Sequence, residues 1–421
     1  MRVGVVGAGI TGLSLVHHLR ERDVSAVAFE AEDRPGGVVR SDRIDGRVVE
    51  RGPHRIRLTD PVEELVEAVG LAEEVIRADD DLPLYVYRNG RLREVPRSLG
   101  AFLRTDLLSW RGKLRTLAEP LTDAADPDER LDDLFTRKFG AEAYRYVVEP
   151  LLSGIYASDP AEMQVRHATP GLLRVEERDG NLLRPALRRA RSDGTAPPVS
   201  FEGGLGTLPR AVHDAHEDRV HLDEPVERVE DDGDRYAVVT DDRRETVDRV
   251  VVTTPAGAAA DVLEPVAPDA ADRLRRLNYN PIAMVYLRSD ADLTGFGYQV
   301  AAGEGLRTRG VTFVDSLFGR ESPYTAFLGG MSDPSVIDDP EEELAETARR
   351  EFEAVTGGSA TARGVNRLRA YPAHDTSWTA LDGMELPGGI RLATNYTGRI
   401  GVPSRVREAR RIAEELAGGA D

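Results

Sequence analysis

The sequence predicts an α/β protein that contains more than one domain. The chain has 421 residues, which is too long for one ordinary domain, so we expect two or three. Apolar residues make up 40% of the chain, which is enough to build sizeable cores. Near the N-terminus, a β-branched run leads through a glycine-rich turn into an amphipathic segment and then a second apolar run. This alternation of strand, helix and strand is typical of a parallel sheet covered by helices.

The first strand is expected at residues 2–6 (RVGVV), and GAGITG follows it directly at residues 7–12. Each glycine of this turn has a separate role in binding a dinucleotide. Gly7 makes the tight turn, Gly9 lets the backbone approach a pyrophosphate, and Gly12 lets the helix pack on the strand. The helix N-terminus offers free N–H groups and a positive dipole end to the phosphates. The alternative is a glycine-rich turn that only packs.

A second strand is expected at residues 25–29, and it ends in Glu30, 18 residues after Gly12. The carboxylate of Glu30 can accept both hydroxyl groups of a ribose. It would also repel a 2′-phosphate, which argues against NADP as the dinucleotide.

Residues 30–41 (EAEDRPGGVVRS) resemble the R-x-G-G motif of the amine-oxidase-like class of FAD enzymes. In that class, Gly36 and Gly37 permit close backbone approach to the flavin side of the cofactor. The usual arginine after the paired glycines is Val38 here. The segment Gly52-Pro53-His54 lies beside the isoalloxazine in that class, and His54 is either a flavin-side residue or an incidental turn residue.

Further cofactor signals occur far along the chain. Val226 lies in an expected strand, at the position where this class contacts adenine through its backbone. Residues 246–263 read as a strand that runs through Thr-Thr-Pro into a helix, and residues 389–416 read as a strand, a loop and a helix. Ser404 is the expected N-cap of that last helix. The preceding loop, 395–403, would direct a positive helix end at reduced flavin; the alternative is an ordinary capped terminal helix.

The class resemblance therefore implies a discontinuous, Rossmann-like FAD-binding domain, a mixed-sheet substrate domain and a helical insert. We expect the FAD-binding domain at residues 1–78, 199–256 and 375–421, the substrate domain at 79–94 and 257–374, and the helical domain at 95–198. The implied cofactor contacts are Gly7, Gly9, Ile10, Thr11, Gly12, Glu30, Ala31, Arg34, Gly36, Gly37, Val38, Gly52, Pro53, His54, Val226, Asn395, Ile400, Gly401 and Val402.

Three longer segments extend the resemblance along nearly the whole chain. LLSWRGKLRTLAEPL (107–121), EPLLSGIYASDP (149–160) and FEGGLGTLPRAV (201–212), in this order and spacing, resemble the protoporphyrinogen/coproporphyrinogen oxidase family. The resemblance implies that the LLSGIY segment lines a porphyrinogen cavity, where Ser153 and Gly154 break a helix so that backbone faces the macrocycle. From the residues alone, such an apolar run is more often the core at a helix end.

The family resemblance also implies a reaction in haem biosynthesis. FAD would take hydrides from a porphyrinogen, protoporphyrinogen IX or coproporphyrinogen III, and dioxygen would reoxidise the flavin and yield hydrogen peroxide. No catalytic acid or base is identified. Arginines would hold the substrate's propionates, and Arg166 and Arg174 are candidates. The number of propionates to be held, two or four, stays open.

Two other readings use the same fold. One is a carotenoid-type desaturase or an amine oxidase, for which Tyr396 and Trp378 are the local candidates for an aromatic cage. The other is a non-enzymatic protein of the dissociation-inhibitor type, which would bind a protein and its lipid without redox chemistry and without tightly bound flavin.

The charge of the chain is strongly negative and restricts its partners. There are 74 acidic and 55 basic residues, a formal net charge of -19, which excludes a nucleic-acid-binding role. Lys113 and Lys138 are the only lysines. High acid content with almost no lysine resembles proteins of salt-loving archaea, for which dilute buffer would be destabilising. The alternative is a low-pI protein from a high-GC genome.

The chain has no cysteine, so disulfides, thiolate metal sites and a cysteinyl flavin link are excluded. The eight histidines show no metal-binding spacing, and we expect no metal; the adjacent His17 and His18 are expected to face apart and to be structural. No signal peptide and no membrane-spanning run is expected, which predicts a cytoplasmic protein.

One segment of the helical insert leaves membrane contact open. Leu99, Phe102, Leu103, Leu107 and Trp110 would share one face of a helix. A core-facing helix is the simpler reading, and peripheral contact with a membrane is the alternative. The oligomeric state stays open.

Overall fold

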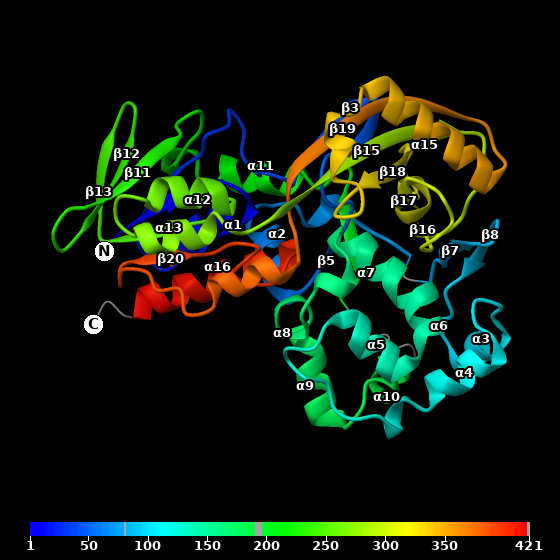
Figure 1. Ribbon diagram of the computed structural model, residues 1–421. Coiled ribbons are helices and arrows are strands. Elements are labelled where there is room, and N and C mark those ends of the chain that lie inside the picture. Colours follow the sequence, from blue (N-terminus) through cyan, green and yellow to red (C-terminus); the bar gives the residue numbers. More distant parts are fainter. Residues whose placement is uncertain (80, 190–195, 419–421) are drawn as a thin grey trace. The chain divides into compact units, whose positions relative to one another are not determined.

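A computed structural model describes residues 1–79, 81–189 and 196–418, and its helices and strands are drawn in Figure 1. The chain divides into two compact units. The first comprises Met1–Ala78, Ala196–Leu277 and Thr379–Asp421, and the second comprises Asp79–Thr195 and Asn278–Trp378. This division differs from the expected one. Residues 257–277 fold with the first unit, and the helices of 95–198 share a unit with the strands of 279–372.

The first unit is organised by a five-stranded sheet in which every neighbouring pair is parallel. Its strands, in spatial order, are β10 (Val220–His221), β2 (Ser25–Phe29), β1 (Arg2–Val6), β14 (Arg249–Val252) and β20 (Ile390–Leu392). The valines of β1 and β14 are buried on both faces of the sheet, as parallel strands between helices require. Because the strands come from all three chain segments, the sheet joins these segments into one unit.

Two helices from opposite ends of the chain pack together in this unit. They are α1 (Ile10–Arg20) and α16 (Val402–Gly418). Leu13, Val16 and Leu19 of α1 lie in the same core as the apolar residues of α16, which are Val402, Val406, Ala409, Ile412, Ala413 and Leu416. Helices α2 (Asp60–Ala68) and α11 (Thr207–Asp214) contribute to this core.

Smaller elements complete the first unit. They are the antiparallel sheet of β11 (Val226–Asp231), β12 (Tyr236–Thr240) and β13 (Arg244–Val247); the hairpin of β3 (Ser41–Ile44) and β4 (Arg47–Glu50); the sheet of β5 (Ile56–Arg57), β9 (Pro198–Phe201) and β6 (Val75–Arg77); and the helices α12 (Ala256–Leu263) and α13 (Pro268–Leu274).

The second unit is built on a seven-stranded mixed sheet. In spatial order its strands are β19 (Ala360–Pro372), β15 (Tyr279–Ser289), β18 (Tyr324–Gly329), β17 (Thr308–Thr312), β16 (Gly297–Val300), β7 (Leu84–Arg88) and β8 (Arg91–Glu94). The pair β16 and β7 is parallel and the others are antiparallel. Helix α15 (Glu341–Thr356) packs on the sheet, and Leu344, Ala348 and Phe352 enter its core.

The rest of the second unit is helical. Its helices are α3 (Leu99–Arg104), α4 (Trp110–Leu117), α5 (Leu131–Phe139), α6 (Ala141–Ala143), α7 (Glu149–Tyr156), α8 (Val165–Ala168), α9 (Pro170–Asp179) and α10 (Leu183–Arg189), with a π-helical turn at Tyr144–Val148. Lys138, one of the two lysines, is buried; its ammonium contacts Glu176 and donates to Asp123 O at 2.9 Å. Within the described residues, no helix has the length and apolar character needed to cross a bilayer.

The expected single helical face of residues 99–110 is wrong. Helix α3 ends at Arg104, and α4 begins only at Trp110, after an irregular turn. Leu107 is fully buried whereas Trp110 is 67% exposed, so these residues face different surroundings. A pattern spaced for one helix therefore falls on two short ones.

The two adjacent histidines of α1 both contact Glu21, so the expectation that they face apart is also wrong. His18 Nδ1 lies 2.9 Å and His17 Nε2 lies 3.5 Å from its carboxylate. His17 Nδ1 lies 3.0 Å from His216 Nε2, and His216 Nδ1 lies 3.2 Å from the guanidinium of Arg20. Because Arg20 can only donate, neutral His216 carries its proton on Nε2 and donates to His17. His17 then carries its own proton on Nε2, the nitrogen that a metal at Glu21 would need.

Candidate functional site

The residues predicted to bind a dinucleotide gather at one edge of the parallel sheet. Gly7 follows β1, Glu30 follows β2, Thr253 follows β14 and Thr394 follows β20. Because all these strands are parallel, their carboxyl ends meet at the same edge. In open α/β sheets, ligands bind at this edge.

The glycine turn has the geometry that its three roles require. Gly7 has a positive φ of 98°, and a Cβ on Gly12 would lie 2.0 Å from Gly7 O. A Cβ on Gly9, in contrast, would meet no atom within 4 Å. Gly7 and Gly12 are thus needed for packing, whereas Gly9 opens onto free space at the N-terminus of α1, where Ile10 and Thr11 form the first turn.

The second pair of glycines lies directly beside the first turn. The N–H of Gly36 donates to Ala8 O at 2.9 Å, and a Cβ on Gly37 would lie 3.5 Å from Gly9 Cα. Arg34 fixes the loop by donating to Gly37 O at 3.1 Å. The two glycine motifs, separated by more than twenty residues in sequence, therefore form one backbone-lined surface.

Glu30 stands beside this surface and connects it to a distant strand. Its carboxylate accepts hydrogen bonds from the N–H of Ala8 at 2.7 Å and from Glu32 N–H at 3.1 Å. The N–H of Glu224 donates to Glu30 O at 2.8 Å, which brings the start of β11, and with it Val226, next to the acid. Ala31, the residue after the acid, is exposed.

The segment Gly52-Pro53-His54 lies against the paired glycines. A Cβ on Gly52 would lie 1.9 Å from Val38 O, so only glycine allows this approach. Val38 is 45% exposed although it is apolar, and His54 is buried. The structure thus places these residues together, and their contact with a flavin stays a prediction.

A set of contacts that supports the Gly36–Gly37 loop was not predicted from the sequence. The buried carboxylate of Glu50 accepts hydrogen bonds from Ser41 Oγ at 2.5 Å and from Leu205 N–H at 3.1 Å. A Cβ on Gly204 would lie 2.3 Å from Ser41 Oγ, and a Cβ on Gly36 would lie 2.8 Å from Pro209. The FEGGLGTLPRAV segment (201–212) therefore supports the loop that contains Gly36 and Gly37. In the sequence, the paired Gly203 and Gly204 of this segment were the feature that could have indicated such close packing.

The C-terminal loop reaches the same edge of the sheet. The hydroxyl of Tyr396 donates to Thr254 O at 3.2 Å, next to the Thr253 side chain that donates to Gly7 O at 3.0 Å. Asn395 Oδ1 is buried and has no hydrogen-bond partner among the described residues.

The predicted N-cap of the terminal helix is wrong. Helix α16 begins at Val402, directly after Gly401, which has a φ of 106°. Ser404 is therefore inside the first turn, where its N–H already donates to Gly401 O at 3.0 Å. The helix starts three residues earlier than expected and brings Ile400 and Gly401 to its N-terminus.

Arg405 holds this loop in place and was missed in the sequence. Its buried guanidinium donates to Thr394 O, donates to Arg399 O at 3.1 Å and pairs with Glu408 at 2.5 Å. Burial lowers the pKa of Arg405, and the charge of Glu408 opposes that shift. The only sequence signal is an arginine on the apolar face of the helix, between Val402 and Ala409.

These features fit a bound dinucleotide. The free space at Gly9 would admit a pyrophosphate at the N-terminus of α1, and Glu30 is placed beside it for a ribose. The buried, unpartnered amide oxygen of Asn395 fits a polar ligand edge near the N-terminus of α16. The chain thus has separate groups for the two ends of such a cofactor.

The predicted break in the LLSGIY helix of the second unit is absent. Helix α7 is continuous from Glu149 to Tyr156 and ends where Ala157 adopts a left-handed conformation. Gly154 has a different role, because a Cβ there would lie 2.3 Å from the side-chain amide of Gln299. The segment is also not plain core, since Ile155 is 58% exposed.

A buried carboxyl group lies on the same helix. Glu149 accepts a hydrogen bond from Ser153 Oγ at 3.0 Å and lies 3.7 Å from the guanidinium of Arg309. Burial raises the pKa of Glu149, and the nearby Arg309 opposes this rise. Of the two arginines suggested from the sequence, Arg166 pairs with Asp128 at 3.0 Å, and Arg174 is exposed on α9. Arg309 and Ser153 both approach the same oxygen of Glu149, Oε1.

The end of α7 meets a cluster of aromatic rings. His374 lies between Tyr156 and Trp378, with both ring centroids 4.6 Å away. Burial lowers the pKa of His374 to about 4, so the imidazole is neutral near pH 7. The indole N–H of Trp378 donates to Ala373 O at 2.5 Å. Trp378 is therefore packed inside the second unit, and Tyr396 belongs to the first unit.

Comparisons with known proteins agree with this geometry. Residues 10–417 match the family model of flavin containing amine oxidoreductases. Protoporphyrinogen oxidase 1 of Spinacia oleracea is 29% identical over 415 residues, covering 87% of this chain and 73% of the relative. Coproporphyrinogen III oxidase of Staphylococcus aureus is 26% identical over 388 residues, covering 83% of both chains.

Solved structures show the same fold. A candidate protoporphyrinogen oxidase from Exiguobacterium sp. 255-15 has a TM-score of 0.83 and 24% identity, covering 99% of this chain and 98% of that one. A putrescine oxidase has a TM-score of 0.73 and 16% identity, covering 99% of both chains.

Proposed function

Because the chain belongs to the family of flavin-containing amine oxidoreductases, and is thus an FAD-dependent oxidoreductase, we propose that it oxidises a porphyrinogen to the porphyrin in haem biosynthesis. The substrate would be protoporphyrinogen IX or coproporphyrinogen III, and dioxygen would be the electron acceptor. The observation that carries this proposal is the match, over most of the chain, to relatives named for both of these oxidations. Membership in this family of oxidoreductases argues against the non-enzymatic, dissociation-inhibitor alternative.

The first unit would bind the cofactor through the groups at the carboxyl edge of its parallel sheet. Gly9 and the N-terminus of α1 would hold the pyrophosphate, Glu30 the ribose, and Asn395 with the N-terminus of α16 the flavin end. When bound, FAD supplies the capacity to accept a hydride from a carbon atom. Arg405 keeps the loop of residues 394–399 fixed on α16, so the protein groups around the flavin are positioned before substrate arrives.

The second unit would hold the substrate, with Ser153 and Gly154 of α7 in its wall. Arg309 lies 3.7 Å from Glu149 on the same helix, and it is a better candidate for a propionate than Arg166, which pairs with Asp128 at 3.0 Å. Glu149 would then compete with a propionate for Arg309. Burial raises the pKa of Glu149, and the charge of Arg309 opposes that rise.

The proposed reaction is tested by mixing the flavin-loaded protein anaerobically with coproporphyrinogen III and, separately, with protoporphyrinogen IX. We expect the flavin absorbance to bleach with at least one of them, and porphyrin fluorescence and hydrogen peroxide to appear when air enters. Putrescine serves as the control substrate, because amine oxidases share the fold. Bleaching by putrescine alone, or by none of the three, would contradict the proposal.

A peripheral contact with a membrane is proposed as part of this function. Large apolar side chains are exposed on the helices that follow β8: Leu99 and Leu103 on α3, Trp110 and Leu114 on α4, and Leu121 in the turn after them. Scattered exposed leucines are ordinary, but this group includes a tryptophan, which favours a bilayer interface. A cytoplasmic protein with this surface would sample the membrane reversibly.

A further inference from the structure

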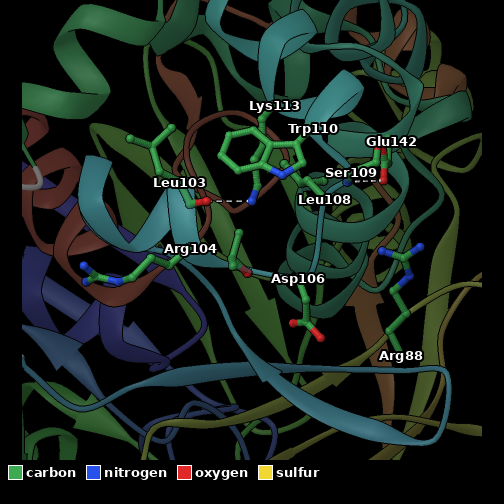
Figure 2. Close-up of a pocket in the computed structure, with 10 residues that line it drawn as sticks. Arg88, Leu103, Arg104, Asp106, Leu108, Ser109, Trp110, Lys113 and Glu142 are labelled. Carbon is green, nitrogen blue, oxygen red and sulfur yellow. Dashed lines mark hydrogen bonds between the residues drawn. The ribbon is translucent and has the colours of Figure 1, made fainter.

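A pocket of about 930 Å³ opens within the second unit, between α3, α4 and the end of β7. Figure 2 shows Arg104 and Arg88 on opposite sides of it, and Trp110 and Lys113 above it. All of its lining residues belong to one compact unit. The fold therefore forms this pocket without any of the proposed cofactor-binding residues.

The segment that forms the pocket has a charge opposite to that of the whole chain. Residues 88–118 contain eight basic and two acidic residues, a formal charge of +6, in a chain with a net charge of -19. One of the two lysines in the sequence, Lys113, lies in this pocket. Such a local reversal of charge favours an anionic partner at this position.

The acidic groups of the pocket are engaged within the protein. Asp106 pairs with Arg93 at 3.0 Å. Glu142 accepts hydrogen bonds from the N–H and the hydroxyl of Ser109, both at 2.7 Å, which fixes it at the start of α4. Neither carboxylate therefore needs a cation from solution.

The basic groups retain free donors. Within the described residues, the exposed side chain of Arg104 has no hydrogen-bond or ion-pair partner. Lys113 donates one hydrogen bond, to Leu103 O at 2.8 Å, and lies 4.5 Å from the ring of Trp110. Arg88 stacks on Tyr146 at 3.4 Å and already donates to Leu107 O, so it adds positive charge beside the pocket, and Arg104 and Lys113 supply the donors. These donors can surround a small, strongly charged acceptor such as phosphate.

The rim of the pocket is apolar. Of the lining residues, Trp110 is 67% exposed and Leu103 is 39% exposed. Leu114, which lies outside the lining but on the same helix as Trp110, is also 67% exposed. An indole at such a rim suits the boundary between headgroups and hydrocarbon, because one edge is polar and the faces are apolar. Anion-binding donors below an apolar rim match an amphiphile with a charged head and a hydrocarbon tail.

We propose that this pocket binds the phosphate headgroup of an anionic membrane lipid, with Arg104 and Lys113 as its main contacts and Trp110 beside the acyl chains. The proposal rests on the peripheral membrane contact suggested above and adds a specific partner. Direct binding of a phosphate group in the pocket differs in its salt dependence from a general electrostatic attraction between a basic surface and an anionic membrane. At 1 M salt the screening length is about 3 Å, so only directly paired groups remain attracted.

The test is flotation of the flavin-loaded protein with vesicles of phosphatidylglycerol or of phosphatidylcholine, in 0.2 M and in 1 M KCl, without substrate. We expect binding to phosphatidylglycerol vesicles at both salt concentrations and little binding to phosphatidylcholine. Arg104→Gln should lower binding at 1 M KCl about tenfold, the usual effect of losing a charge-assisted hydrogen bond. Arg111→Gln, which removes the same charge from an exposed α4 residue outside the pocket, should retain binding within about twofold.

Several outcomes would overturn the proposal: no flotation of the wild-type protein, equal binding to both lipids, or equal losses in the two variants. Binding of inorganic phosphate to the protein without any flotation would show a soluble phosphate ligand instead of a lipid. Because flavin bleaching by porphyrinogens is measured without vesicles, failure of the lipid proposal and failure of the proposed oxidation are distinguishable.

Discussion

At the scale of single residues, the glycines of the first turn are required for two different reasons: one for packing within the protein, the other for binding a cofactor. Gly12 has no room for a methyl group because Gly7 O would lie 2.0 Å from it. Gly9 has ample room in the protein itself. A glycine with free space in front of its Cα is required only when another molecule fills that space.

Gly9→Ala should therefore fold but bind flavin poorly. After removal of flavin, we expect its free energy of unfolding to stay within about 0.5 kcal/mol of the wild type, while flavin content after reconstitution falls at least tenfold. Gly12→Ala should instead lose on the order of 4 kcal/mol because of the clash. Gly257→Ala, at another open glycine on α12, is the matched control and should keep its flavin. Full flavin content in Gly9→Ala would refute the assigned role of Gly9.

His374 should make the protein sensitive to mild acid. Burial lowers its pKa from 6.5 to about 4, with Asp375 opposing the shift, so below pH 6.5 the unfolded chain binds more protons than the folded protein. The stability contributed by the neutral ring is complete above pH 6.5 and falls as the pH decreases toward 4, by up to about 1.4 kcal/mol per pH unit. Thermal unfolding of wild type and His374→Phe between pH 4.5 and 7.5 checks this. The variant should lose less stability on acidification, and identical profiles would contradict the role of His374.

At the scale of elements, the start of α16 depends on one buried arginine. Arg405 connects the helix to Thr394 O and Arg399 O, and Glu408 balances its charge. The loop it holds contains Asn395, which has a buried oxygen without a protein partner. The arginine thus holds in place the loop that we propose to face the cofactor.

Arg405→Met should destabilise the protein by roughly 3 kcal/mol, because it removes the contacts of a buried guanidinium with Thr394 O and Arg399 O and leaves the partly buried Glu408 with Arg411, 4.0 Å away, as its counter-charge. It should also expose the loop of residues 394–401, which limited proteolysis would detect as faster cleavage there. Arg407→Met, an exposed neighbour on the same helix, should leave both properties near those of the wild type. Unchanged cleavage in Arg405→Met would show that the loop is held by other contacts.

Some elements could be predicted from the sequence, whereas others depend on contacts between distant residues and could not. The GAGITG turn was predicted because Gly7 and Gly12 serve the geometry of a turn between a strand and a helix that adjoin it in sequence. Gly154 was misread as a helix breaker because its true neighbour, Gln299, is 145 residues away. Arg405 was missed for the same reason, since its partner Thr394 lies in a loop without a regular pattern. Residues 99–110 kept a helical spacing, but no pattern in them marks the turn after Arg104.

At the scale of the whole molecule, charge is the dominant feature. A net charge of -19 creates repulsion that dissolved salt must screen. The basic segment at residues 88–118 is a local exception and concentrates positive charge where the lipid pocket is proposed.

We expect the thermal unfolding midpoint to rise steadily as KCl increases from 0.2 to 3 M, because the screening length shrinks from about 10 Å near 0.1 M to about 3 Å at 1 M. Sucrose at matched osmotic strength is the control, since it favours compact states without screening charge. An equal rise in sucrose would indicate solvent exclusion instead of charge screening, and a midpoint independent of salt would contradict the halophilic interpretation.

The order of strands in the parallel sheet has a consequence for how the protein is made. Strand β1 is synthesised first, but its neighbour β14 follows some 245 residues later, and β20 later still. On the ribosome, the carboxyl edge of this sheet therefore cannot be complete until β14, β20, Asn395 and the start of α16 have all been translated. Flavin loading must then wait for these late segments, and until they arrive the early valine-rich strands are candidates for protection by chaperones.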